Sequence, residues 1–146
     1  MADELLALDS SCLVALAATW HERHTAVLDH LQRQATVGAT FVVPAHVLVE
    51  TYSVLTRVPA PMQLAPEAVL AFLDGNAPRW RIADGLPGHE MAAFLKDCAS
   101  KGVTGGRVYD AAIAWSALRA GATAIVTLNP RHFRQFEAAG LAVVAP

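Results

Sequence analysis

The fold of this 146-residue chain is decided by residues 107–129, RVYDAAIAWSALRAGATAIVTLN. Residues 107–120 are rich in alanine and are followed by Gly121, which is typical of a helix that ends at a glycine. The apolar run at 124–127 comes next and predicts a short buried strand. A helix that leads directly into a buried strand is one half of a βαβ unit, so this stretch predicts a parallel sheet covered by helices.

The same alternation of strands and helices extends toward both ends of the chain. Apolar, β-branched runs predict five strands, at 4–9, 40–43, 79–82, 124–127 and 141–144. Helical periodicity, capping residues and prolines predict helices between them, at 12–18, 22–36, 45–58, 66–73, 87–100, 107–120 and 130–138. The fold class is therefore α/β, and residues 1–146 are expected to form one domain because no repeat or linker interrupts them.

Composition excludes several classes of protein. Hydrophobic residues make up 54% of the chain and charged residues 16%, a balance that excludes intrinsic disorder. The longest apolar runs fall far short of the ~20 residues that a bilayer helix needs, and the N-terminal stretch carries acids where a secretion signal requires positive charge. We therefore expect a cytoplasmic protein that does not bind a membrane. The high apolar content also predicts a dimer or a permanent protein partner.

The net charge and the cysteines exclude further classes of protein and of site. A net charge of −2 argues against a nucleic-acid coat protein, although an enzyme that contacts nucleic acid locally stays possible. Cys12 and Cys98 lie far apart and without metal-ligand spacing, so neither a disulfide framework nor a zinc site is indicated. Both thiols are expected to be buried.

Two acidic residues occupy positions where contact with solvent alone does not account for a carboxylate. Asp9 ends the first strand, and ligands of open α/β sheets bind at the carboxyl ends of strands; a helix N-cap is the alternative role. Glu50 lies at the border of the apolar stripe of its helix, beside His46 and Arg57. The alternative for Glu50 is a surface carboxylate that pairs with a helical neighbour.

Asp110 is the most informative acid. At about 100° per residue it shares a helix face with Ile113 and Ala117, whereas Ser116 and Arg119 mark the opposite side. Its carboxylate is therefore expected to point inward. Because unpaired burial of a carboxylate is costly, Asp110 requires a cation, a cluster of donors or a metal ion as its partner.

The acids and the polar residues after the fourth strand converge at one edge of the predicted sheet. Asn129 precedes Pro130 there, and an ordinary turn is its alternative role. Oxygen ligands with no cysteine nearby favour Mg²⁺ or Mn²⁺, and two such ions could activate a water and stabilise the leaving oxygen of a phosphodiester. Phosphodiester hydrolysis is favoured over redox or ATP chemistry, because neither GxGxxG after a strand nor GxxxxGK[ST] occurs.

Three segments of the chain together resemble a known family: LALDSS at 6–11, PAHVLVET at 44–51 and GGRVYDAAIAWSALRAGATAIVTLNPRHF at 105–133. Their order and spacing resemble the PIN domain, in particular the VapC-type ribonuclease toxins of bacterial toxin–antitoxin pairs. The resemblance spans nearly the whole chain and is most specific in the third segment. It implies a three-layer α/β/α fold with a parallel sheet of about five strands, and a metal-dependent endoribonuclease that holds Mg²⁺ or Mn²⁺.

The resemblance also implies the site residues and the partners. Asp9, Glu50 and Asp110 match the three main metal-site acids of the family, and Asn129 matches a fourth catalytic position that many members fill with Asp. A neutral Asn offers a cation only its carbonyl oxygen, which favours a single ion or a second one that binds only with substrate. The implied partners are RNA, a second copy of the chain, and a cognate antitoxin, for which an Arg inserted among the carboxylates would pair well.

Four further polar residues are candidates for substrate contact: Ser11, Arg107, Thr127 and Arg131. The two hydroxyls would position water or phosphate, with a helix cap and a strand end as the alternative roles. The two arginines would hold backbone phosphate, with solvated surface residues as the alternative. His132 is expected to be structural. The tryptophans are expected in the core or at an interface, because no basic stripe interleaves them: Trp20, Trp80 and Trp115.

Two other functions stay open at this point. A phosphoacceptor receiver domain also places aspartates at the carboxyl ends of parallel strands, but it usually requires a Lys after a late strand, and only Lys96 and Lys101 occur. A catalytically inactive PIN-like module that binds protein or RNA is the second alternative, suggested by Asn129.

Overall fold

The structure of the chain is a computed structural model that describes residues 3–146. Strands and helices alternate along it, in agreement with the predicted class. The strands are β1 Leu5–Leu8, β2 Thr40–Pro44, β3 Trp80–Ala83, β4 Ala124–Val126 and β5 Ala142–Val144. The α-helices are α1 Ser10–Ala17, α2 His24–Thr36, α3 Ala45–Arg57, α4 Pro66–Asn76, α5 Met91–Ser100 and α6 Arg107–Arg119. Short 3-10 helices cover Ala77–Arg79, Gly88–Glu90, Pro130–His132 and Arg134–Ala139.

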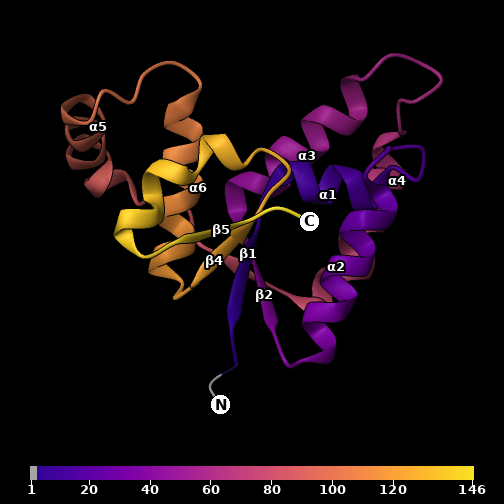
Figure 1. Ribbon diagram of the computed structural model, residues 1–146. Helices are drawn as coiled ribbons and strands as arrows, with labels where there is room; N and C mark the ends of the chain where they lie inside the picture. Colours follow the sequence, from indigo (N-terminus) through magenta and orange to yellow (C-terminus); the bar gives the residue numbers. More distant parts are fainter. Residues whose placement is uncertain (1–2) are drawn as a thin grey trace.

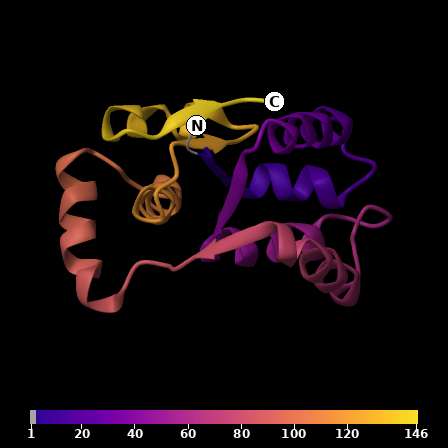
Figure 2. The same ribbon diagram turned by 90° about the horizontal axis from the view of Figure 1, so that it is seen from below.

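The five strands form one parallel sheet in the order β3-β2-β1-β4-β5. Helices α1 to α4 lie on one side of it, and α5, α6 and the C-terminal 3-10 helices lie on the other (Figures 1 and 2). Right-handed crossovers explain this division, because the strand order changes direction after β3. The predicted three-layer α/β/α fold with a five-stranded parallel sheet is therefore confirmed.

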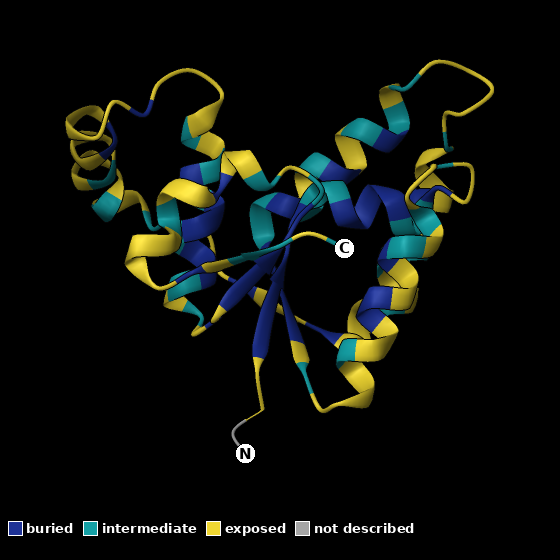
Figure 3. Cartoon of the chain, viewed as in Figure 1, coloured by how far each residue is buried: buried dark blue, intermediate teal, exposed yellow. Residues whose placement is uncertain are grey.

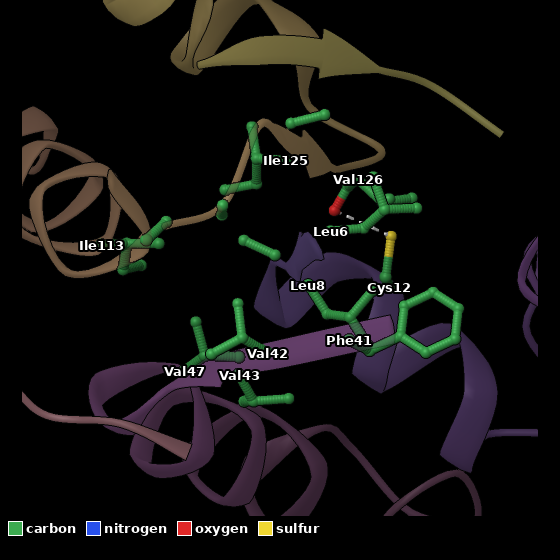
Figure 4. Close-up of a cluster of buried hydrophobic side chains, with 14 of the residues drawn as sticks. Leu6, Leu8, Cys12, Phe41, Val42, Val43, Val47, Ile113, Ile125 and Val126 are labelled. Carbon is green, nitrogen blue, oxygen red and sulfur yellow. Dashed lines mark hydrogen bonds between the residues drawn. The ribbon is translucent and has the colours of Figure 1, made fainter. Parts of the chain in front are cut away.

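The core lies between the sheet and its two helical layers, where the central strands are buried along their length (Figure 3). Figure 4 shows how side chains from different elements meet there: Leu8 of β1, Val42 of β2, Ile113 of α6 and Ile125 of β4 are all fully buried. Each such side chain stabilises the fold by about 1.5–3 kcal/mol. Both cysteines are buried as predicted, and the Cys12 thiol donates to the carbonyl oxygen of Val126 at 3.3 Å.

The largest difference from the predicted elements lies after β4. The expected helix at 130–138 is wrong, because two 3-10 helices occupy this region. Pro130 carries no N–H, and the chain must turn within a few residues to reach β5, so the tighter 3-10 bonds form, such as Phe136 N–H to Phe133 O at 2.9 Å. Gly140 then ends the segment with a φ of 98°, a conformation that glycine adopts without strain.

Smaller differences lie at the ends of other elements. Residues 88–90 form a 3-10 turn before α5, whereas one helix was predicted from residue 87, and α4 runs three residues further than predicted. The predicted outward position of Ser116 is also wrong, since Ser116 is only 4% exposed. It borders a cavity together with Ala83 and Pro87, so the segment that connects β3 to α5 covers this side of α6.

In the part of the chain that the structure describes, no helix is long and apolar enough to cross a membrane.

Candidate active site

The carboxyl edge of the sheet, at the top in Figure 1, borders a cavity of about 390 Å³. The four residues predicted as catalytic all line it: Asp9, Glu50, Asp110 and Asn129. Asp9 follows β1 directly, Glu50 comes from α3, Asp110 from the first turn of α6, and Asn129 from the segment after β4. The fold therefore brings together residues that are up to 120 positions apart in the sequence.

Asp9 is the most deeply placed of the acids, with 4% of its surface exposed. The hydroxyls of Ser11 and Thr127 donate to its Oδ2 at 3.0 and 2.8 Å. These hydroxyls in turn accept the N–H groups of Leu128 and Asn129, both at 2.9 Å. Although Asp9 occupies the N-cap position of α1, its side chain makes no capping hydrogen bond. Ser11 and Thr127 thus fix the orientation of this carboxylate.

Replacing Thr127 with valine is expected to lower the free energy of unfolding by about 1–3 kcal/mol, because a buried carboxylate loses a hydrogen-bond donor while the shape of the side chain is kept. Urea unfolding at pH 7 measures this loss. The matched control is Thr36→Val on the exposed surface of α2, which should change stability by less than about 0.5 kcal/mol. Equal losses in the two variants would contradict the role assigned to Thr127.

Glu50 is oriented by two residues that were not predicted as site residues. Ser10 Oγ donates to Glu50 Oε2 at 2.9 Å, and His46 Nε2 lies 3.4 Å from Glu50 Oε1. The His46 ring stacks on Tyr109 of α6, with ring centroids 5.5 Å apart and planes 6° apart. The i,i+4 spacing of His46 and Glu50 was the available signal for this pair. The contact between Ser10 and Glu50 joins α1 to α3, so nothing in the local sequence indicated it.

The surroundings of Asp110 disfavour the ionised form of its carboxyl group. Its side chain is 19% exposed, and its Oδ2 lies 3.6 Å from His132 Nδ1. Burial is the main reason why the pKa of Asp110 is raised to about 6, and the carboxylates of Asp9 and Glu50 raise it further, whereas His132 and Arg107 lower it. The inward orientation predicted for Asp110 agrees with this burial, and His132 is placed beside the acid.

The arginines proposed for phosphate contact lie outside the acidic cavity. Arg107 is exposed at the first position of α6 and Arg131 is exposed in a 3-10 helix, and neither borders the acidic cavity. Arg57, which was noted only as a neighbour of Glu50, does border it. Within residues 3–146 the Arg57 guanidinium has no ion-pair partner. It is therefore a free cation beside three carboxylates.

The donor set of the cavity fits a hydrated hard cation. Three carboxylates and the amide oxygen of Asn129 are the oxygen ligands that Mg²⁺ and Mn²⁺ prefer, and a cation would offset both the burial of the Asp110 carboxylate and its repulsion by Asp9 and Glu50. Across residues 3–146, however, no three His, Cys, Asp or Glu side chains form a ready-made group that would bind one metal ion without water. Mg²⁺ usually keeps several waters and uses one or two carboxylates, so a ready-made protein cage is not required.

Comparisons with known proteins agree with this geometry. The PIN domain model matches residues 6–139. The chain is 42% identical over 134 residues to Ribonuclease VapC40 of Mycobacterium tuberculosis, which covers 91% of this chain and 92% of VapC40. It is 32% identical over 140 residues to Ribonuclease VapC27 of the same organism, with 95% of each chain covered.

Solved structures show the same fold at lower identity. VapC20 of Mycobacterium tuberculosis superposes with a TM-score of 0.67 over 97% of this chain and 99% of that chain, at 17% identity. A chain of VapBC2 from Rickettsia felis gives a TM-score of 0.68 over 97% and 98%, at 19% identity. The family model and the two ribonuclease relatives together show that this chain belongs to the PIN domain family, in its branch of VapC-type ribonuclease toxins.

Proposed function

We propose that this chain is a Mg²⁺- or Mn²⁺-dependent endoribonuclease whose cation is held by Asp9, Glu50 and Asp110, with Asn129 as a fourth catalytic residue. The observation that carries the proposal is the single cavity that these four residues line at the carboxyl edge of a parallel sheet. The raised pKa of Asp110 supports it further, because a buried carboxylate that also faces two other carboxylates requires a positive charge. The relationship to the VapC ribonucleases supports the choice of RNA.

The residues of the site divide into those that would hold the cation and those that orient them. Asp9 is kept in place by two hydroxyls, and Glu50 by Ser10 and His46, so both carboxylates are preorganised. A bound Mg²⁺ or Mn²⁺ supplies activation of water and charge neutralisation at a phosphate. Asn129 adds an oxygen without adding negative charge. Arg57 is positioned to hold a phosphate of the substrate.

The purified chain is expected to cut RNA internally when Mn²⁺ is present and to stop when a chelator removes the ion. A pool of structured RNAs is the appropriate substrate, and it should contain a sarcin–ricin loop, because the related VapC20 is a toxin that cleaves that loop. Gel analysis of the cleaved pool measures the result. An absence of cutting together with an absence of Mn²⁺ uptake in calorimetry would contradict the proposal and favour an inactive binding module.

The receiver-domain alternative has no support from the structure. A receiver requires a lysine at the end of a late strand, whereas Lys96 lies in α5 and Lys101 directly follows it. Strands β4 and β5 are followed by Thr127 and Ala145 instead. Membership of the PIN family also argues against it.

We also propose that a cognate antitoxin and a second copy of the chain bind this protein in the cytoplasm. Homologues of the same fold were crystallised as toxin–antitoxin assemblies, among them VapBC2 of Rickettsia felis and VapBC of Salmonella typhimurium. Exposed apolar side chains are available for such contacts, for example Val49, Tyr52 and Leu95. Three carboxylates in one cavity would accept an arginine of the antitoxin.

A further inference from the structure

A second cavity, of about 480 Å³, adjoins the acidic cavity. Ser10, Val54 and Asn129 border both, so the two spaces are continuous along the carboxyl edge of the sheet. Val14 and Leu128 add an apolar wall to the second cavity. Its volume lies in the range of about 300–1,000 Å³ that is typical of small-ligand sites. No residue of this wall is explained by the binding of a cation.

The loop between α1 and α2 supplies the polar side of this cavity, through His21, Glu22 and Arg23. The loop is held by its own hydrogen bonds, because the N–H of Arg23 donates to His21 Nδ1 at 3.0 Å and the N–H of His21 donates to Ala18 O at 2.9 Å. His24 at the start of α2 adds a contact between its ring and Ala15 O at 2.8 Å. The loop is therefore preorganised.

The hydrogen bonds of the loop leave donors free to face the cavity. Because His21 Nδ1 accepts a hydrogen bond, the ring proton sits on Nε2, where it can be donated. Arg23 donates from Nη2 to the main-chain oxygen of Pro146. A guanidinium has five N–H groups, so the others remain available for a phosphate.

Trp20 stands beside these donors and is not in the core. Its side chain is 43% exposed, so of the two predicted positions, core or interface, the core is excluded, and its ring packs against His21 with centroids 6.0 Å apart. An exposed indole in the same short loop as a guanidinium supplies two groups with which proteins hold single-stranded nucleic acid, since every base can stack on an aromatic ring. No cation site requires a tryptophan.

The negative charge of the acidic cavity explains why an RNA substrate needs positively charged groups nearby. A nucleic-acid backbone that enters a cavity with three carboxylates is repelled there, and among the described residues that line the acidic cavity Arg57 is the one arginine or lysine that opposes this. Cationic groups outside it must then attract the neighbouring phosphates. At the boundary, the neutral amide of Asn129 can donate to a phosphate, which a carboxylate at that position would repel.

We propose that the second cavity and Trp20 form a subsite for a nucleotide one position beyond the two nucleotides that the cut phosphodiester joins. Arg23 binds the phosphate of that nucleotide, Trp20 stacks on its base, and Val14 and Leu128 contact its ribose. The inference rests on the proposed function, since it assigns the acidic cavity to cleavage. It adds that recognition extends beyond the cleaved bond toward the loop between α1 and α2.

Binding of single-stranded RNA tests the subsite without any requirement for cleavage. A labelled 12-nucleotide RNA is titrated into protein that carries Asp110→Asn, and Arg23→Ala is compared with Arg33→Ala, an exposed arginine of α2 outside both cavities. Arg23→Ala is expected to weaken binding about tenfold and to reduce the slope of log K against log salt by about 0.7. Arg33→Ala should leave both quantities unchanged. Equal behaviour of the two variants would overturn the proposal.

Trp20 is tested by the same titration. Trp20→Ala is expected to weaken binding about tenfold, whereas Trp20→Phe should recover most of it, because a phenyl ring still stacks on a base. The salt slope should not change in either variant, since no charge is removed. Loss of the same size in both variants, or no loss in Trp20→Ala, would contradict the stacking role.

A cleavage assay separates this inference from the proposed function. In the active protein, Arg23→Ala should reduce kcat/KM about tenfold for a 12-nucleotide RNA and leave kcat/KM for a dinucleotide unchanged, because the dinucleotide does not reach the subsite. If the unmodified chain cuts neither substrate and takes up no Mn²⁺, the proposed function fails while the binding titration still decides on the subsite. An equal reduction for both substrates would overturn the subsite.

Discussion

Replacing Asp110 with asparagine is expected to reduce the rate of Mn²⁺-dependent RNA cleavage by about 10²–10³-fold, the size typical of losing one preorganised electrostatic group in an active site. The substitution keeps the shape of the side chain and removes one of three negative charges that line the cavity. Cation binding should weaken in parallel, because an amide offers a neutral oxygen where a carboxylate offers a charged one. Single-turnover cleavage of a defined RNA measures the rate, and calorimetry measures the Mn²⁺ affinity.

The matched control for this experiment is Asp74→Asn. Asp74 is exposed on α4 and borders neither the acidic cavity nor the second one. The Asp74→Asn substitution removes the same charge from the chain, so it shows how much of any change in RNA binding comes from net charge alone. Cleavage at the unmodified rate by Asp110→Asn would rule out a role of this carboxylate in catalysis.

The same substitution is expected to stabilise the metal-free protein at neutral pH. Burial raises the pKa of Asp110 to about 6, so the folded state holds this proton more tightly than the unfolded state does. The free energy of unfolding therefore falls as the pH rises from about 4 to 6. Above that range the destabilisation by the ionised Asp110 has reached its full size. At pH 7.5 the Asp110→Asn variant should be more stable by at most about 3 kcal/mol, since each pKa unit corresponds to about 1.4 kcal/mol.

Urea unfolding in the presence of a chelator measures this gain as the difference between the two proteins at each pH. The difference should be small at pH 4 and should grow through pH 6, whereas the control Asp74→Asn should show no such growth. Mn²⁺ should reverse the order, because it stabilises the folded state of the unmodified chain by mass action. A difference that does not depend on pH would contradict the electrostatic origin of the effect.

Most of the fold could be predicted from local sequence patterns. Alternating apolar runs and helical stretches indicated five parallel strands and both helical layers, because buried parallel strands require apolar residues and a covering on each face. The 3-10 helices at 130–139 escaped prediction, since their apolar pattern does not differ from that of an α-helix. The burial of Ser116 escaped it as well, because the residues that cover it belong to a distant segment.

The candidate site, too, could be predicted only in part. The positions of Asp9, Glu50 and Asp110 could be predicted, because each follows from a strand end or a helix face and the carboxyl ends of parallel strands share an edge. The partners of these acids could not be predicted. Ser10 reaches Glu50 across 40 positions and Thr127 reaches Asp9 across 118, so only packing decides that they meet.

The sequence by itself determined the α/β class, the edge of the sheet where the acids gather and the membership of a nuclease family, because these depend on periodicity and on motif order. The tertiary structure alone decided which hydroxyls fix each carboxylate, that Asp110 is buried enough to raise its pKa to about 6, and that Arg23 lines a second cavity while Trp20 packs on the neighbouring His21. The physical reason is that desolvation and charge repulsion depend on distances between residues remote in sequence, which local patterns do not contain.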